Sequence, residues 1–61
     1  MSERLIRRPE VEKRTGLSRS TIYDWLKRGE FPLPVKLGKR LVAWREGDIT
    51  AWIESREKRA K

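Results

Sequence analysis

Apolar and polar residues separate most clearly in residues 18–29, where they recur with the 3.6-residue period of an amphipathic helix. Ser18 is a favoured helix N-cap, and Gly29 is the residue type that most easily ends a helix in the left-handed conformation. The apolar side of this helix comprises Ile22, Trp25 and Leu26. The opposite side comprises Ser20, Tyr23, Asp24 and Lys27, with Arg19 and Thr21 beside it near the start. The pattern predicts a short helix with an apolar back and a front of hydrogen-bonding groups.

A shorter helix is predicted ahead of it, over residues 9–16. Pro9 is tolerated in a first helical turn, and Gly16 is a natural stop. Val11 is the only clear apolar anchor of this segment, so the segment must pack on the following helix to be stable. Leu17 is expected to fill the angle between the two helices. Two helices joined by a tight, glycine-containing turn form a helix-turn-helix pattern.

Residues 30–44 carry the signals of an extended link followed by a β-hairpin. Two prolines in the link exclude a helix, and Phe31 between them and the preceding helix is expected to cover the core. Strands are predicted over 35–37 and 41–44, around a turn at 38–40. The second strand is apolar throughout, so the pattern leaves its register open.

The last predicted element is a helix over about 46–61, in which Ile49, Trp52, Ile53 and Ala60 recur at helical spacing. Leu5 and Ile6 either form a short extended segment over the core or fray. The chain is thus expected to be one domain over 1–61, with its core in about 5–57. Its fold class is mainly α with a small β-hairpin, in the order of a winged helix-turn-helix: helix-turn-helix, two-stranded wing, C-terminal helix.

A chain of 61 residues buries only about 60% of the surface that its unfolded form exposes, so its core depends on a few large side chains. The three tryptophans are expected to supply much of this core. The alternative for Trp25 and Trp52 is an exposed position where bases stack on the indole. Both lie in phase with aliphatic neighbours, which favours the core.

The net charge of the chain indicates what kind of partner it binds. Sixteen Lys and Arg against nine Asp and Glu give a net charge of +7, and the pI is about 10.6. Such an excess favours a polyanionic partner, above all nucleic acid, although basicity also serves solubility. A short helix with a polar front is what the major groove of DNA accommodates. Residues 18–28 are therefore interpreted as a DNA recognition helix and residues 38–40 as a basic wing.

Missing residue types exclude several kinds of chemistry. The chain has no cysteine and no histidine, so disulfides and the usual zinc sites are excluded and no cofactor is expected. Its carboxylates are scattered over helix faces, and no acid–base or nucleophilic constellation can be assembled, so an enzyme is not expected. No apolar run approaches the roughly 20 residues of a membrane span, and no signal-peptide core is found. We expect a cytoplasmic protein that makes no membrane contact.

Candidate DNA contacts at the start of the recognition helix are Arg19, Ser20, Thr21 and Tyr23. Arg19 is placed to reach a guanine edge or a phosphate. Ser20 and Thr21 either bond phosphates at the amide-rich helix end or only cap the helix. Tyr23 either packs on a thymine methyl group or bonds a phosphate through its hydroxyl.

Further candidate contacts are lysines and one arginine. Lys27 and Lys36 are expected at most to set the position of the duplex by charge. Lys39 and Arg40, at the hairpin tip, form either a solvated turn or a wing that contacts phosphate or enters the minor groove. The neighbouring recognition helix favours the wing.

Three segments and one tryptophan carry a resemblance to a known family. They are Thr15–Tyr23 (TGLSRSTIY), Gly29–Pro32 (GEFP) and Pro34–Gly38 (PVKLG), together with Trp44. In this combination the chain resembles the AlpA-like small regulators of phages and prophages, which belong to the broader MerR-like and excisionase-like winged helices. The resemblance spans roughly residues 8–54.

The resemblance implies a cytoplasmic DNA-binding protein of a mobile element, which acts as a transcriptional regulator or as an excisionase that bends DNA at attachment sites. It carries over contact roles for Arg19, Ser20, Thr21, Tyr23 and Lys27, the wing role for Lys39 and Arg40, and core roles for Ile22, Trp25 and Leu26. Asp24 departs from the family pattern, where a basic or neutral residue is expected. Asp24 either accepts from a cytosine amine or pairs with Lys27 or Arg28 one turn on.

The expected partner is double-stranded DNA, with further copies of the chain on repeated sites and an integrase or RNA polymerase as possible protein partners. A footprint this small reads few base pairs, so we expect a monomer that becomes cooperative on DNA. The alternative function is a protein-interaction adaptor for an acidic partner. An adaptor needs an exposed apolar patch, whereas nearly every large apolar residue here has an expected core position.

Overall fold

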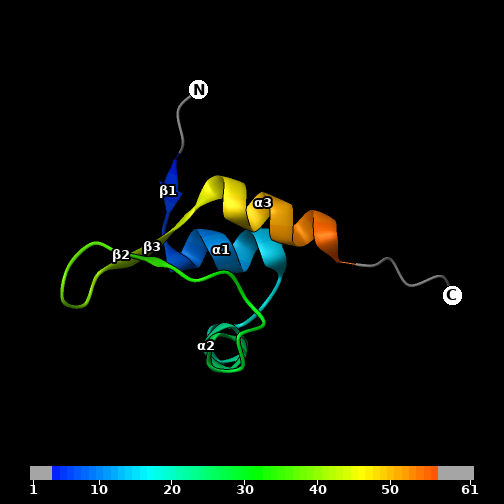
Figure 1. The fold of residues 1–61 in the computed structure, drawn as a ribbon, viewed down its shortest axis with the longest axis horizontal. Helices are drawn as coiled ribbons and strands as arrows, with labels where there is room; N and C mark the ends of the chain where they lie inside the picture. Colours follow the sequence, from blue (N-terminus) through cyan, green and yellow to red (C-terminus); the bar gives the residue numbers. More distant parts are fainter. Residues whose placement is uncertain (1–3, 57–61) are drawn as a thin grey trace, which may run out of the picture.

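The structure is a computed structural model of the chain and describes residues 4–56. Its elements are β1 (Leu5–Ile6), α1 (Arg8–Thr15), α2 (Arg19–Lys27), β2 (Val35–Lys36), β3 (Val42–Arg45) and α3 (Glu46–Ser55). Figure 1 looks along the axis of α2, with α1 and α3 above it and the hairpin of β2 and β3 projecting to one side. This order and arrangement confirm the predicted fold class, a mainly helical winged helix-turn-helix.

The turn between α1 and α2 has the predicted chemistry. Gly16 ends α1 at φ +76°, in the left-handed region that glycine adopts without strain, and its amide donates to the Glu12 carbonyl at 2.8 Å. Ser18 then caps α2, because its hydroxyl accepts from the Thr21 amide at 3.3 Å. Leu17, between them, packs against the core cluster. The helix-turn-helix is therefore built by local capping on both sides of a very short connection.

Two backbone hydrogen bonds typical of a glycine C-cap close the end of helix α2. The Gly29 amide donates to the Leu26 carbonyl at 3.1 Å, and the Glu30 amide donates to the Trp25 carbonyl at 2.8 Å. Gly29 has φ +73°, as this pair of bonds requires. The chain consequently leaves α2 at a defined angle into the proline-containing link, where Phe31 is buried as predicted.

A three-stranded antiparallel sheet, in the order β1-β3-β2, replaces the predicted two-stranded hairpin. Ile6 pairs with Trp44, so the extended alternative for the first apolar segment is the one observed. On the other side of β3, Lys36 pairs with Val42, which fixes the register that the sequence left open. The predicted strands are slightly too long at the hairpin tip, where Leu37 and Leu41 lie outside the ladder and are exposed.

The core is one cluster that draws on every helix and on two strands. Its buried members are Ile6, Val11, Ile22, Phe31, Trp44 and Ile49. Trp44 is fully buried, as predicted, whereas Trp25 and Trp52 are half-buried and pack on the edge of the cluster. The indoles are thus split between the core and its boundary.

Helices α1 and α3 are joined by ion pairs through Arg14. The guanidinium lies 3.1 Å from the Glu10 carboxylate on its own helix and 2.7 Å from the Glu46 carboxylate at the start of α3. Hydrogen bonding to Glu10, and then to Glu46, raises the pKa of Arg14 above its ordinary value. A raised pKa means that this contribution to stability is complete at neutral pH and is lost only in strong alkali.

The prediction that the last helix continues to the end of the chain is wrong, because α3 ends at Ser55. The Ser55 hydroxyl donates to the Trp52 carbonyl at 2.7 Å, and Arg56 is extended with its guanidinium 4.7 Å from the centroid of the Trp52 ring. Such side-chain bonds compete with helix continuation. Ala60 and the basic residues beside it lie outside the described residues.

The packing of α2 generates a stability prediction. Ile22 is fully buried on the back of α2, so Ile22→Val is expected to lower the free energy of unfolding by about 1 kcal/mol in urea denaturation. Leu33→Ala removes more carbon from a side chain that is 75% exposed and is the matched control, with a change below about 0.5 kcal/mol. Equal losses in both variants would contradict the assignment of the core.

Candidate nucleic-acid interface

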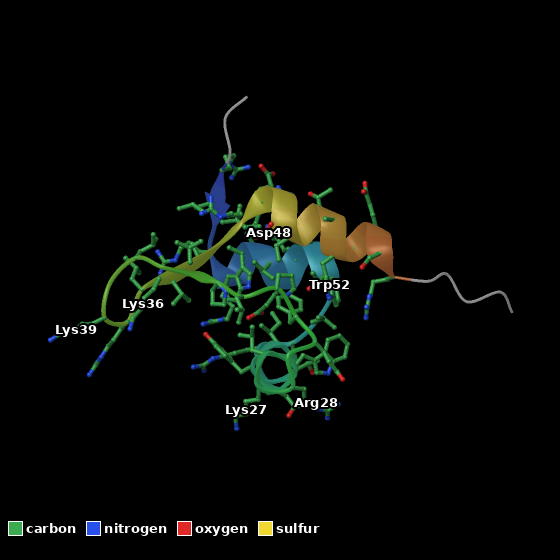
Figure 2. The ribbon with its side chains drawn as sticks, viewed as in Figure 1. Lys27, Arg28, Lys36, Lys39, Asp48 and Trp52 are labelled. Atoms are coloured by element: carbon green, nitrogen blue, oxygen red, sulfur yellow. The ribbon has the colours of Figure 1, made fainter. Side chains whose placement is uncertain are left out.

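The front of α2 faces away from the body of the protein. Ile22 holds the back of the helix in the core, whereas Tyr23 is 37% exposed and Lys27 is exposed. Figure 2 shows Lys27 on the outer side of α2, pointing away from α1 and α3. The predicted recognition surface is therefore accessible to a large partner.

At the start of α2 the hydroxyls are mostly engaged with one another. The Ser18 hydroxyl lies 3.0 Å from that of Thr21, which is therefore part of the cap, and 3.4 Å from that of Ser20. Ser20 is exposed and has only this long contact within the described residues. Arg19 lies over the Tyr23 ring, with its guanidinium carbon 5.8 Å from the ring centroid. Arg19 and Ser20 are thus the side chains of this end that remain most available.

Asp24 forms an ion pair along α2. Its carboxylate lies 2.9 Å from the guanidinium of Arg28, one turn further on, and both side chains are about half exposed. Of the alternatives open from the sequence, pairing with Arg28 is the one observed. The pair neutralises the only acidic residue of α2, so α2 retains an excess of positive charge.

Two cations of the hairpin, Lys36 and Arg40, lie on the side of the hairpin that faces α2. Lys36 lies directly opposite Val42 in the ladder, and opposite residues share one face of a sheet. Val42 faces Tyr23 across a common pocket, so Lys36 lies on the face of the hairpin that turns toward α2. Lys39 lies at the far end of the hairpin (Figure 2), and both Lys39 and Arg40 are exposed.

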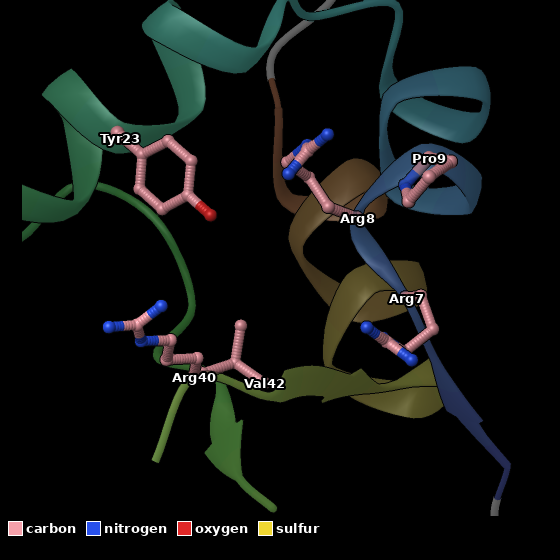
Figure 3. A pocket seen from close by; sticks show the side chains of 6 residues that line it. All are labelled: Arg7, Arg8, Pro9, Tyr23, Arg40 and Val42. Carbon is pink, nitrogen blue, oxygen red and sulfur yellow. The ribbon is translucent and has the colours of Figure 1, made fainter. Parts of the chain in front are cut away.

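A pocket of about 210 Å³ lies where the start of α1, the front of α2 and the hairpin meet. It is lined by Arg7, Arg8, Pro9, Tyr23, Arg40 and Val42 (Figure 3). The pocket brings Tyr23 and Arg40 together, which the sequence placed in separate elements. It also adds Arg7 and Arg8, which sequence reasoning did not select. The available signal was an arginine pair directly before Pro9, at a helix start where positive charge opposes the helix dipole.

Arg8 is held in place from two sides. Its Nε donates to the Glu12 carboxylate at 2.8 Å, and the Tyr23 hydroxyl lies beside it. Hydrogen bonding to Glu12, and then to Tyr23, raises the pKa of Arg8 above its ordinary value. The Arg8 guanidinium is therefore charged at every physiological pH; Glu12 bonds its Nε, which leaves the terminal nitrogens for Tyr23 and for a ligand of the pocket.

Other kinds of site are not found in the part of the chain that the structure describes. Residues 4–56 contain no group of acidic side chains placed to hold a metal ion. They also contain no helix that is long and apolar enough to cross a membrane. Exposed leucines are present, however, and correct one expectation: Leu33, Leu37 and Leu41 are 75%, 47% and 41% exposed and have no core position.

These features define a winged helix-turn-helix protein whose exposed α2 front and basic hairpin adjoin one pocket. The chain belongs to the family described as prophage CP4-57 regulatory protein (AlpA), whose model matches residues 4–57. It is 39% identical over 59 residues to the DNA-binding transcriptional activator AlpA of Escherichia coli K12, covering 87% of this chain and 84% of that protein.

A second relative comes from a phage. The chain is 52% identical over 54 residues to the uncharacterized protein ORF88 of Enterobacteria phage P4. The match covers 88% of this chain and 61% of that protein, so the chain spans less than two thirds of this relative's length. No solved structure matches the chain.

The contacts at the start of α2 generate a second prediction. Ser18→Ala removes the cap of α2 and is expected to lower the free energy of unfolding by about 1 kcal/mol. Ser20→Ala, the matched control, removes only a 3.4 Å contact and is expected to leave the thermal midpoint unchanged. A larger loss in Ser20→Ala than in Ser18→Ala would reverse the assignment of the cap.

Proposed function

We propose that the protein is a sequence-specific DNA-binding regulator of a phage or other mobile element. Helix α2 enters the major groove, and the hairpin tip acts as the wing beside it. The observation that carries the proposal is that Tyr23 of α2 and Arg40 of the hairpin line one pocket on the exposed side. The front of α2 and the wing thereby form one continuous basic surface, as a duplex requires.

The distribution of ion pairs supports this proposal. In residues 4–56, Lys27, Lys36, Lys39 and Arg40 form no ion pair, and all four are exposed. The carboxylates near them pair with other cations, as Asp24 does with Arg28. Unpaired cations on one side can neutralise phosphates and release counterions, which is the main source of affinity for DNA.

Specificity in this proposal comes mainly from Arg19. It lies at the start of α2, where recognition helices contact base edges, and its guanidinium is free of any carboxylate in the described chain. Arginine pairing with guanine is the commonest specific contact in the major groove. Ser20, Thr21 and Tyr23 contribute contacts to the backbone, and Lys27 and Lys36 set the position of the duplex.

Two regulatory roles remain within this class, and the E. coli relative is named as a transcriptional activator. The protein acts either as a transcriptional regulator or as an excisionase, with RNA polymerase or an integrase as the corresponding partner. Footprinting across the DNA that flanks its gene distinguishes them. Protection over a promoter supports regulation, whereas protection of direct repeats at an attachment site supports excision. Protected repeats would also support cooperative binding of several monomers.

The alternative function is an adaptor for an acidic protein partner. It gains support from the exposed leucines at the hairpin, Leu37 and Leu41, and from Leu33 in the link. The two functions differ in their dependence on duplex DNA and salt, so one titration separates them.

For the DNA-binding function we expect a mobility shift with random duplex DNA at low salt. If about six phosphates are neutralised, the slope of log affinity against log salt is about −5. If the protein instead binds acidic peptides, duplex DNA would show no mobility shift even at low salt. That result would exclude the proposed function and favour the adaptor.

The role of Arg19 has its own test. Arg19→Ala is expected to reduce discrimination between the selected site and random DNA by about tenfold or more, because one bidentate base contact is lost. Its thermal midpoint should stay close to wild type. Arg4→Gln is the charge-matched control, because Arg4 pairs with Glu46 at the start of α3, away from α2 (Figure 1). Parallel loss of stability and binding in Arg19→Ala would show that Arg19 is structural.

A further inference from the structure

We propose that the pocket between α1, α2 and the hairpin is a binding site for one phosphodiester group of the DNA backbone. Arg7, Arg8 and Arg40 supply its positive charge, and Tyr23 supplies a hydroxyl donor. The inference rests on the proposed DNA-binding function and deepens it. It assigns Arg40 to a phosphate and leaves Lys39, at the hairpin tip, as the residue for the groove.

The lining of the pocket has the chemistry of an anion-binding site. Three of the six lining residues are arginines, and none is acidic. They come from the β1–α1 junction, the first residue of α1 and the hairpin turn, so the pocket gathers charge from parts of the chain that are far apart. Guanidinium groups are the preferred partners of phosphate oxygens, and a tyrosine hydroxyl adds a neutral donor.

Two of the pocket's arginines form no ion pair in the described chain. Arg7 and Arg40 form no ion pair within residues 4–56, whereas Arg8 is held by Glu12. Like charges that converge on one pocket repel one another unless an anion lies between them. Figure 3 shows the Arg8 and Arg40 side chains on either side of the space that the Tyr23 hydroxyl enters. The arrangement has the charge and the space to hold an anion between the arginines.

The arginine pair at the start of α1 is unfavourable for the helix itself. Arg7 is the N-cap of α1 and forms no side-chain capping bond, and Arg8 is the first helical residue. Serine or aspartate is favoured at this N-cap, and positive charge at a helix start opposes the dipole. The arginine pair therefore makes α1 less stable than simple alternatives would. A role in binding explains why these residue types occupy these positions.

A bound phosphate in this pocket would tie three elements to one point on the DNA backbone. Tyr23 belongs to α2 and Arg40 to the wing, so the shared phosphate fixes the angle between recognition helix and wing on the duplex. The consequence for specificity is indirect: the pocket carries no base information but sets where Arg19 and Lys39 meet the grooves.

Arg7→Ser is the most informative variant, because its two effects have opposite sign. Serine is a better N-cap, so the thermal midpoint is expected to rise, while affinity for duplex DNA falls about tenfold as a charged contact is lost. Arg40→Gln is expected to lower affinity by a similar factor without the gain in stability. Arg4→Gln is the charge-matched control and is expected to leave the affinity within about twofold.

A shared phosphate makes the variants non-additive. Arg7→Ser combined with Arg40→Gln is expected to lose less affinity than the product of the single losses, because both act on one phosphate. DNA with a single neutral methylphosphonate, moved along each strand of the footprinted site, identifies that phosphate. Wild-type protein is expected to lose affinity at this position, and the double variant is expected to be insensitive to it.

The outcomes separate the two proposals. Failure of the wild-type protein to bind duplex DNA would overturn the proposed function. Normal DNA binding by Arg7→Ser and Arg40→Gln, or a double variant that remains sensitive at every methylphosphonate position, would overturn the pocket assignment alone. Titration with inorganic phosphate, followed by NMR at the arginine side chains, tests a free anion. The assignment to the DNA backbone would also be overturned if inorganic phosphate saturated the pocket while no methylphosphonate position changed the affinity for DNA.

Discussion

A continuous set of aromatic contacts connects α2 with β3, the central strand of the sheet. Trp44, in the central strand, packs edge-on against Phe31 at 6.3 Å between ring centroids and donates to the Pro32 carbonyl at 2.9 Å. Phe31 packs against Trp52 of α3 at 4.9 Å, and Trp52 lies 6.1 Å from Trp25 of α2. These ring contacts connect β3, the proline-containing link, α3 and α2 within one hydrophobic core and its boundary. In a domain this small large rings supply much of the burial, so α2 and β3 cannot move apart without opening these contacts.

The ion pairs of the acidic residues determine which cations on the surface remain unpaired. Carboxylates of α1, α2 and α3 pair with arginines that hold helices together or lie along one helix, as Arg14 does with Glu46 and Arg28 with Asp24. The lysines of α2 and the hairpin receive no such partner within residues 4–56. In the described part of the chain, unpaired arginines therefore line the pocket where α1, α2 and the hairpin meet. Exposed pairs stabilise a fold only weakly, so their main effect here is on which cations remain available.

Local sequence signals predicted most of the fold, but they did not predict the long-range pairing of β1 with β3. The Ser18 cap and the glycines at 16 and 29 act through adjacent backbone groups, so their helix ends were readable from residue type. The third strand depends on Ile6 finding Trp44 across the chain, and no local pattern encodes that pairing. The predicted end of α3 was wrong because Ser55 and Arg56 both contact Trp52. Helix propensities do not encode such contacts. Of the candidate contact residues, Thr21 is half-buried in the cap and the others are exposed, and their contact with DNA stays a prediction; the pocket that Tyr23 and Arg40 share required the three-dimensional arrangement.

The start of α1 shows how local and global requirements conflict in this domain. Gly16, Ser18 and Gly29 follow the rules of capping, whereas α1 begins with Arg7 and Arg8 and has no side-chain cap; α3 also begins without a side-chain cap. Glu12 offsets part of the cost by holding Arg8, and Val11 anchors the helix in the core one turn later. A helix that is short and marginal by itself can tolerate such a start only because its stability comes from tertiary packing. Proteins often break such local rules at functional sites, and the break at Arg7 and Arg8 lies at the pocket where α1, α2 and the hairpin meet.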